Sequence, residues 1–78
     1  MIAAIDEEDA RPPYVQLADI LREQIASGEL TGRVPSERTL HEEYGLAPMT
    51  IRKAIRLLRD EGIVRTVPGW GTYVNRET

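Results

Sequence analysis

Basic side chains follow one side of the stretch from Met49 to Arg59. Arg52, Lys53 and Arg56 share a side at helical spacing with Met49, and no acidic residue follows before position 60. The opposite side carries the apolar residues of a core-facing stripe, namely Ile51, Ala54, Ile55 and Leu58. A cationic helix face suits a polyanion, but ordinary solvated helices also carry such charges, and charge alone does not separate the two interpretations.

Other chemistry finds little support in the residue types. The chain has no cysteine and a single histidine, His41, which stands beside Glu42 and Glu43 without metal-ligand spacing or a nucleophile. A solvated or phosphate-facing histidine is the expected state. Adjacent acids point in different directions on a helix, so they predict a solubilising surface. We therefore expect no enzyme, no metal and no cofactor.

Size and composition limit the remaining classes. With 78 residues the chain can form one small domain, and without cysteine no disulfide can support its core. The absence of cysteine fits a reducing compartment. No apolar run approaches the roughly 18 residues of a membrane span, and the N-terminus lacks the pattern of a signal peptide. These observations predict a cytoplasmic protein with no membrane partner.

The charge is unevenly distributed along the chain. The formal net charge is -3, which by itself argues against DNA binding. Residues 1–32 hold two basic residues against seven acidic ones, whereas residues 33–65 hold seven basic against five acidic. The second segment is therefore locally positive, and local charge governs phosphate contact more than the total does.

The chain reads as three helices followed by a hairpin. Residues 1–11 predict an acidic flexible tail, residues 12–75 a domain, and residues 76–78 a frayed end. Helix signals run from Pro13 to Gly28, from the N-cap Ser36 to Gly45, and from Pro48 to about Glu61 before Gly62. Residues 63–67 and 72–74 predict strands joined by a turn over residues 68–71. The fold class is mainly α with a small β-hairpin (α+β): a winged helix-turn-helix, with a three-helix bundle and a two-stranded wing.

Several motifs in this order resemble the GntR family of bacterial transcription regulators. Val34-Pro35-Ser36-Glu37-Arg38 is similar to the family's Leu-Pro-Ser-Glu-Arg signature. Residues 13–30 resemble its first helix, residues 49–54 its recognition helix and residues 69–74 its wing. The resemblance covers roughly residues 12–75, and its Pro-Tyr-x-Gln start is most similar to the HutC and YtrA branches.

The resemblance implies a location in the bacterial cytosol near the nucleoid, a function and a set of contacts. Family members bind double-stranded operator DNA as homodimers, with the recognition helix in the major groove and the wing tip at the minor groove. The residues expected at DNA are Ser36, Arg38, Met49, Thr50, Arg52, Lys53, Arg56, Gly69 and Trp70. Arg38 and Arg52 could each offer a guanidinium fork to guanine, whereas Lys53 and Arg56 suit phosphates.

The sequence departs from the family pattern at four places. Leu46-Ala47-Pro48 replaces the usual Val-Ser-Arg, so a DNA-touching arginine and a capping serine are missing. Loss of the capping serine should cost about 1 kcal/mol of helix stability. The loop at residues 31–33 is about two residues shorter than usual. Trp70 stands where small or basic residues are common, and could pack on deoxyribose, on another protein chain or back on the wing. The family's C-terminal effector domain has no counterpart here, so we expect no ligand sensing within these residues.

Two function classes follow. The first is a sequence-specific transcription regulator, a repressor whose two copies bind an inverted repeat with half-sites about one helical turn apart. The second is a protein-interaction winged helix that partners or antagonises another regulator. Steep salt dependence with base preference would support the first, and stoichiometric protein binding without DNA affinity the second.

Overall fold

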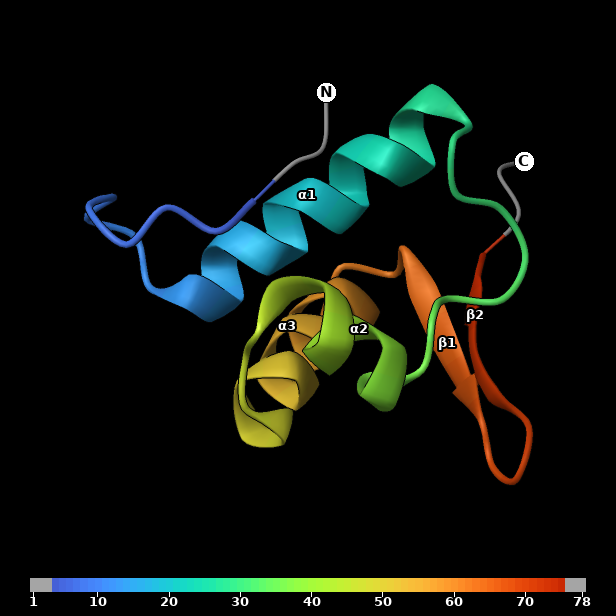
Figure 1. The fold of residues 1–78 in the computed structure, drawn as a ribbon. Coiled ribbons are helices and arrows are strands. Elements are labelled where there is room, and N and C mark those ends of the chain that lie inside the picture. Colours follow the sequence, from blue (N-terminus) through green and yellow to red (C-terminus); the bar gives the residue numbers. More distant parts are fainter. Residues whose placement is uncertain (1–3, 76–78) are drawn as a thin grey trace.

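Three helices and one hairpin make up the fold, in the predicted order. The structure is a computed structural model that describes residues 4–75. Helix α1 spans Pro13–Ser27, α2 spans Glu37–Tyr44 and α3 spans Pro48–Asp60, followed by strands β1 (Val64–Val67) and β2 (Gly71–Val74). In Figure 1, α1 crosses above α2 and α3, and the hairpin extends beside them. The winged helix-turn-helix prediction is confirmed; the predicted fraying of residues 76–78 lies outside the described residues.

The helix ends follow the local signals in the sequence. The Ser36 hydroxyl accepts a hydrogen bond from Thr39 N at 3.2 Å, and so satisfies a backbone donor at the start of α2. Gly45 ends α2 in the left-handed region, at φ 69°. Ala47 stands at the N-cap of α3 and makes no side-chain cap, as its residue type predicts.

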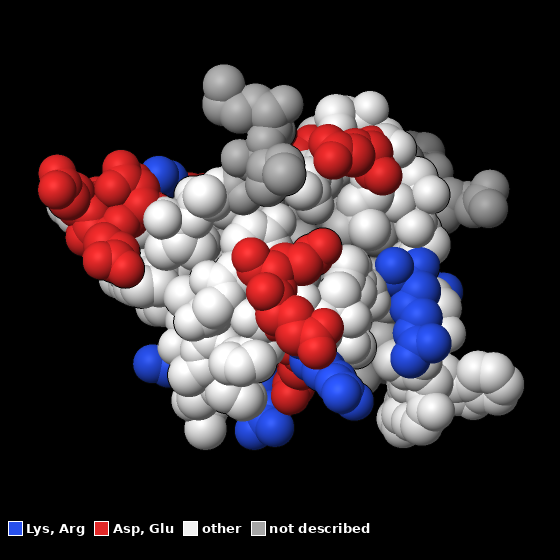
Figure 2. Space-filling model, in the orientation of Figure 1, with Lys and Arg blue, Asp and Glu red and all other residues white. Residues whose placement is uncertain are grey.

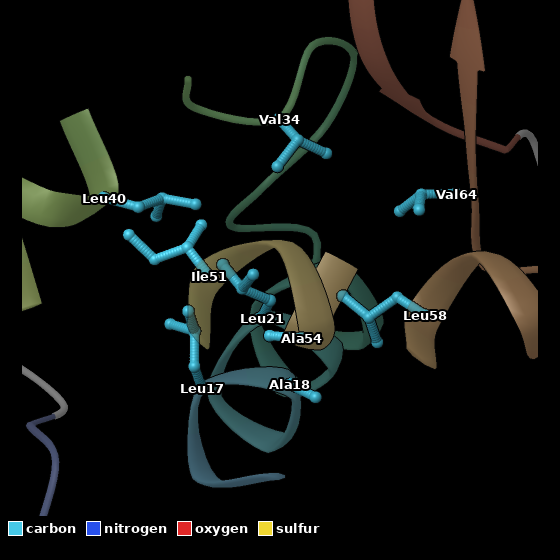
Figure 3. Close-up of a cluster of buried hydrophobic side chains, with 9 residues drawn as sticks. All are labelled: Leu17, Ala18, Leu21, Val34, Leu40, Ile51, Ala54, Leu58 and Val64. Atoms are coloured by element: carbon cyan, nitrogen blue, oxygen red, sulfur yellow. The ribbon is translucent and has the colours of Figure 1, made fainter. Parts of the chain in front are cut away.

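One apolar cluster holds the elements together. Figure 3 shows its nine buried side chains: Leu17, Ala18 and Leu21 from α1, Leu40 from α2, Ile51, Ala54 and Leu58 from α3, Val64 from β1, and Val34 from the connector before α2. Since α1 and α2 both pack on the inner stripe of α3, the opposite face of α3 is left at the surface. Burial of these side chains is the main source of stability in a domain this small.

A third segment, the connector before α2, pairs with the wing, and the sequence did not predict this. β1 and β2 pair antiparallel, from Val64 opposite Val74 to Val67 opposite Gly71. The connector runs along the other side of β2: Val34 N donates to Thr72 O at 2.8 Å, and Val74 N donates to Gly32 O at 2.7 Å. The wing is thereby tied to the segment that leads into α2.

The first strand begins one residue later than predicted, and the second one residue earlier. Ile63 was expected in the first strand because it is β-branched. Its N–H instead donates to Leu58 O at 3.0 Å, so it belongs to the turn that closes α3. Gly71 was expected in the turn, yet it pairs with Val67 at the start of β2.

Residues 4–11 make contacts that a free tail would not make. Gln16 Nε2 donates to the carbonyl oxygens of Asp6 and Arg11, both at 2.9 Å, and its Oε1 accepts from Asp6 N at 2.8 Å. Ile5 packs against the edge of the core. The buried Gln16 amide therefore bonds the backbone of this segment. The flexibility predicted for residues 1–11 stays a prediction.

Candidate nucleic-acid interface

The outer face of α3 presents the side chains that the periodicity predicted. Arg52, Lys53 and Arg56 are exposed, and Met49 is 61% exposed near the N-terminus of the helix. Thr50 is half-buried. Ile51, Ala54 and Leu58 of the inner stripe are fully buried, whereas Ile55 is half-buried and lines the groove beside α3. Packing of this stripe determines which residues of the helix face outward.

A groove of about 410 Å³ lies between the start of α2, the face of α3 and the wing. Its lining includes four arginines, Arg33, Arg52, Arg56 and Arg59, and one acid, Glu37. Figure 2 shows Lys and Arg gathered along the lower edge of the molecule and beside the hairpin, whereas Asp and Glu occupy the centre of this face and the N-terminal segment at the left. A cationic groove bounded by a helix and a hairpin is suited to a phosphate backbone.

Two of the expected DNA-contacting arginines are held by carboxylates on α2. Arg52 Nε donates to Glu37 Oε2 at 2.8 Å, and this hydrogen bond raises the pKa of Arg52. Arg38 Nε lies 3.6 Å from Glu42 Oε2, and the Arg38 side chain is 88% exposed. Exposed pairs of this kind contribute about 0–1 kcal/mol, so a phosphate or a base edge can replace the carboxylate at little cost.

Lys53 and Arg56 differ in their surroundings. Lys53 Nζ lies over the ring of Tyr14, 5.6 Å from its centroid, so α1 supports this residue of α3 through a cation–π contact. For Arg56, no carboxylate of residues 4–75 forms an ion pair. Its guanidinium lines the groove instead.

Trp70 projects from the tip of the wing. Its side chain is 69% exposed, which favours the outward orientations over packing back on the wing. Its backbone is held by bonds from Trp70 N to Val67 O at 2.9 Å and from the Tyr73 hydroxyl to Trp70 O at 3.4 Å. Gly69 precedes it with φ +80°, a conformation that a side chain would strain.

Sequence reasoning missed two arginines of the groove. Arg59 lies seven residues after Arg52 and three after Arg56, so the helical period could have identified it. Arg33 lies in an irregular connector, where no local pattern indicates which way a side chain points. His41 has a structural contact: its Nδ1 lies 2.7 Å from Leu46 O, which as a carbonyl can only accept, so the ring donates to the α2–α3 turn.

Two further arginines, Arg11 and Arg22, lie in ion pairs away from the groove. Arg11 pairs with Asp9 and Asp19, and Arg22 pairs with Asp19 and, at 2.8 Å, with Glu61. The hydrogen bonds from Arg11 lower the pKa of Asp9 to about 2. These pairs connect the N-terminal segment, α1 and the end of α3. Among the described residues, no group of acidic or histidine side chains could hold a metal ion.

Known proteins resemble this chain, in sequence and in structure, over most or all of its length. The chain is 44% identical over 69 residues to the mannosyl-D-glycerate transport/metabolism system repressor MngR of Escherichia coli K12, covering 86% of this chain and 29% of MngR. The structure superposes on YtrA from Sulfolobus acidocaldarius, a GntR-family transcription factor, with a TM-score of 0.88 and 38% identity over 100% of this chain and 84% of YtrA.

A solved complex with DNA is also similar. The structure of AraR(DBD) in complex with operator ORX1 matches with a TM-score of 0.81 and 30% identity, covering 96% of this chain and 93% of AraR(DBD). Residues 13–74 match the description "Bacterial regulatory proteins, gntR family". That match spans all three helices and the wing, and the chain therefore belongs to the gntR family of bacterial regulatory proteins.

Proposed function

We propose that this chain is a sequence-specific DNA-binding domain that acts in transcriptional repression. The observation that carries the proposal is the cationic groove between the start of α2, the face of α3 and the wing. The relatives support it, since MngR is named a repressor and AraR(DBD) was solved on an operator. The N-terminal part of α3 enters the major groove, and the wing tip approaches the adjacent minor groove.

Arg52 is the residue best arranged for reading a base. Its bond to Glu37 uses Nε, and no other hydrogen bond from residues 4–75 holds the terminal Nη groups. Those groups can form the fork to guanine O6 and N7. Met49 and Thr50 lie in the first turn of α3 and supply contacts to neighbouring bases, while Lys53 and Arg56 bind phosphates and hold the helix in register.

Two copies of the chain bind one operator together. Two domains bind an inverted repeat whose half-sites lie about one helical turn apart, because each domain covers one half-site on one face of the duplex. This role belongs in the cytoplasm. Within residues 4–75, no helix is long and apolar enough to cross a membrane.

The first test is selection from a random duplex library, followed by titration of the enriched sites at two salt concentrations. We expect an enriched inverted repeat and an affinity that falls steeply with salt, because arginine and lysine contacts release counterions from DNA. Weak, sequence-blind binding would contradict the proposal. It would favour the second function, a winged helix that binds an acidic protein partner through the same basic face.

A further inference from the structure

Arg33 is held in a fixed position between the helices and the wing. Its backbone forms an antiparallel bridge with Tyr73. The flanking hydrogen bonds, Val34 N to Thr72 O and Val74 N to Gly32 O, attach the connector to β2 on both sides of this residue. Arg33 therefore belongs to the wing in space, although it precedes α2 in the sequence.

The Arg33 side chain fills the space that a side chain at residue 71 would occupy. A Cβ atom built on Gly71 would lie 2.8 Å from Arg33 Nε, closer than Cβ atoms approach other atoms in proteins, and 3.1 Å from Arg33 Nη2, which is a tight contact. Gly71 thus leaves room for the guanidinium against the start of β2. This contact directs the charge of Arg33 into the groove, whose lining includes both residues.

The groove holds more positive charge than its own carboxylates neutralise. Its one acid, Glu37, is hydrogen-bonded to Arg52. For Arg33, Arg56 and Arg59, no acid of residues 4–75 forms an ion pair. Guanidinium groups that share a groove without carboxylates favour an anion that can accept from several of them.

Hydroxyl groups line the wing side of the same groove. Arg59 Nη1 donates to Thr66 Oγ1 at 2.8 Å, and Thr66 Oγ1 lies 3.4 Å from Thr72 Oγ1. This row connects the end of α3 to both strands. Hydroxyls and guanidinium groups together are common donors to phosphate oxygens in protein–DNA interfaces.

We propose that Arg33, with Arg56 and Arg59, binds the phosphates of the DNA strand that separates the major groove at α3 from the minor groove at the wing tip. The inference rests on the proposed function and adds a phosphate site to it. The backbone of a duplex is what lies between its two grooves, and these arginines line the space between the two elements that face those grooves. Arg33 contributes to affinity and register, and reads no base.

The first experiment compares three variants by operator titration over a range of salt. We expect Arg33→Ala to weaken binding about tenfold, as loss of a charged hydrogen bond does. The slope of log K against log salt should become less steep by about 0.9, the value for one phosphate contact. Arg33→Lys keeps the charge and should keep most of the slope.

Arg65→Ala is the matched control. Arg65 lies on β1, stacks on Tyr73 and bonds Asn75 Oδ1 at 3.1 Å, but it does not line the groove. Like Arg33→Ala, this substitution removes one positive charge close to the wing, but from outside the groove. The slope of log K against log salt should therefore stay near that of the unsubstituted protein. An equal loss in Arg65→Ala would contradict a local phosphate site. Circular dichroism of each variant confirms that the fold is intact.

The second experiment replaces single operator phosphates with neutral methylphosphonate along the strand between the grooves. At the phosphate that Arg33 contacts, the replacement should weaken the unsubstituted protein but leave Arg33→Ala almost unaffected. Independent effects at every position, or a loss in Arg33→Ala confined to one base pair, would overturn the inference while operator binding remained. If the unsubstituted protein bound no duplex at all, the proposed function itself would fail.

Discussion

Arg52 is oriented before any DNA is present, because Glu37 Oε2 accepts a hydrogen bond from its Nε at 2.8 Å. Both side chains are about half exposed, so the pair adds little to the stability of the fold. It does reduce the number of conformations open to a long side chain. An arginine held in this way loses less conformational entropy when it meets a base edge.

Substitution of Arg52 and of Lys53 should have different consequences. We expect Arg52→Ala to cost about 1–3 kcal/mol of binding free energy and to relax specificity at one base pair. Lys53→Ala should instead reduce the salt slope by about 1 and weaken all sequences alike. Competition among operator variants at two salt concentrations measures both effects. Equal, sequence-independent losses would show that this division of roles is wrong.

Trp70 gives a direct optical probe of the wing, because it is the one tryptophan of the chain. Its side chain is largely exposed, so free protein should emit at long wavelength and be quenched readily by acrylamide. On operator DNA we expect a blue shift and protection from the quencher. Emission that stays unchanged while labelled DNA binds would show that the indole does not approach the duplex.

The matching variant separates apolar from ionic contact at the wing tip. Trp70→Ala should weaken operator binding by about 1–3 kcal/mol, the range for covering a large apolar side chain. The salt slope should not change, because an apolar contact releases no counterions. A changed slope with Trp70→Ala would indicate that the substitution moves the neighbouring charges of the groove.

The α2–α3 turn shows how local chemistry positions the second helix. α2 has a serine cap and a left-handed glycine at its end, whereas α3 begins at Ala47 without a side-chain cap. The turn itself is fastened by the His41 ring to Leu46 O. The buried stripe of α3 and this hydrogen bond therefore position and stabilise α3 more than its N-cap does.

Cap substitutions should shift stability in opposite directions. We expect Ser36→Ala to lower the free energy of unfolding by about 1 kcal/mol, because Thr39 N loses its acceptor. Ala47→Ser should raise it by up to about 1 kcal/mol, since the backbone at Ala47 is already extended as a cap requires. Urea denaturation without DNA measures both, and Glu23→Ala on the exposed side of α1 is the control, expected within ~0.5 kcal/mol. A stabilising Ser36→Ala would contradict the cap assignment.

Charge is segregated across the whole molecule. The N-terminal segment and α1 neutralise their arginines with Asp9, Asp19 and Glu61, while the groove arginines lie on another surface. A chain of net charge -3 can therefore still present a cationic face. The acidic surface disfavours binding of DNA in any other orientation.

Removal of residues 1–10 should destabilise the fold. The backbone of this segment forms hydrogen bonds with the Gln16 side-chain amide, and Ile5 packs against the edge of the core. We expect a loss of about 1–3 kcal/mol, as several net hydrogen bonds would give. The melting temperature of the truncated chain, compared with the full chain at the same salt concentration, measures it. An unchanged melting temperature would instead support the flexible-tail prediction.

The Asp9–Arg11 contact should produce an acid-dependent part of stability. The Asp9 pKa is lowered from 3.8 to about 2, so the folded state favours the charged carboxylate. Its contribution is present above about pH 4 and is lost as pH falls through about 2. Urea midpoints of the unsubstituted protein and of Asp9→Asn should therefore converge between pH 4 and pH 2. A difference that persisted below this window would contradict the contact.

Local patterns in the sequence determined the element order and most helix boundaries. The i, i+3, i+4 stripe of α3 and the capping residues Ser36, Gly28 and Gly45 act over one or two turns, so they are readable without the fold. The same periodicity separated the outer residues Arg52, Lys53 and Arg56 from the core. The family resemblance added the expected function, and the match over residues 13–74 confirmed the family.

Tertiary structure alone decided which distant residues meet. The pairing of the connector with β2, the packing of Arg33 on Gly71, and the contact of Gln16 with residues 6–11 each join segments whose local sequence contains no sign of the other. Lys53 on Tyr14 and Arg22 on Glu61 are of the same kind. Such contacts depend on how the apolar stripes pack the helices together, and only the packed core places these side chains within reach of each other.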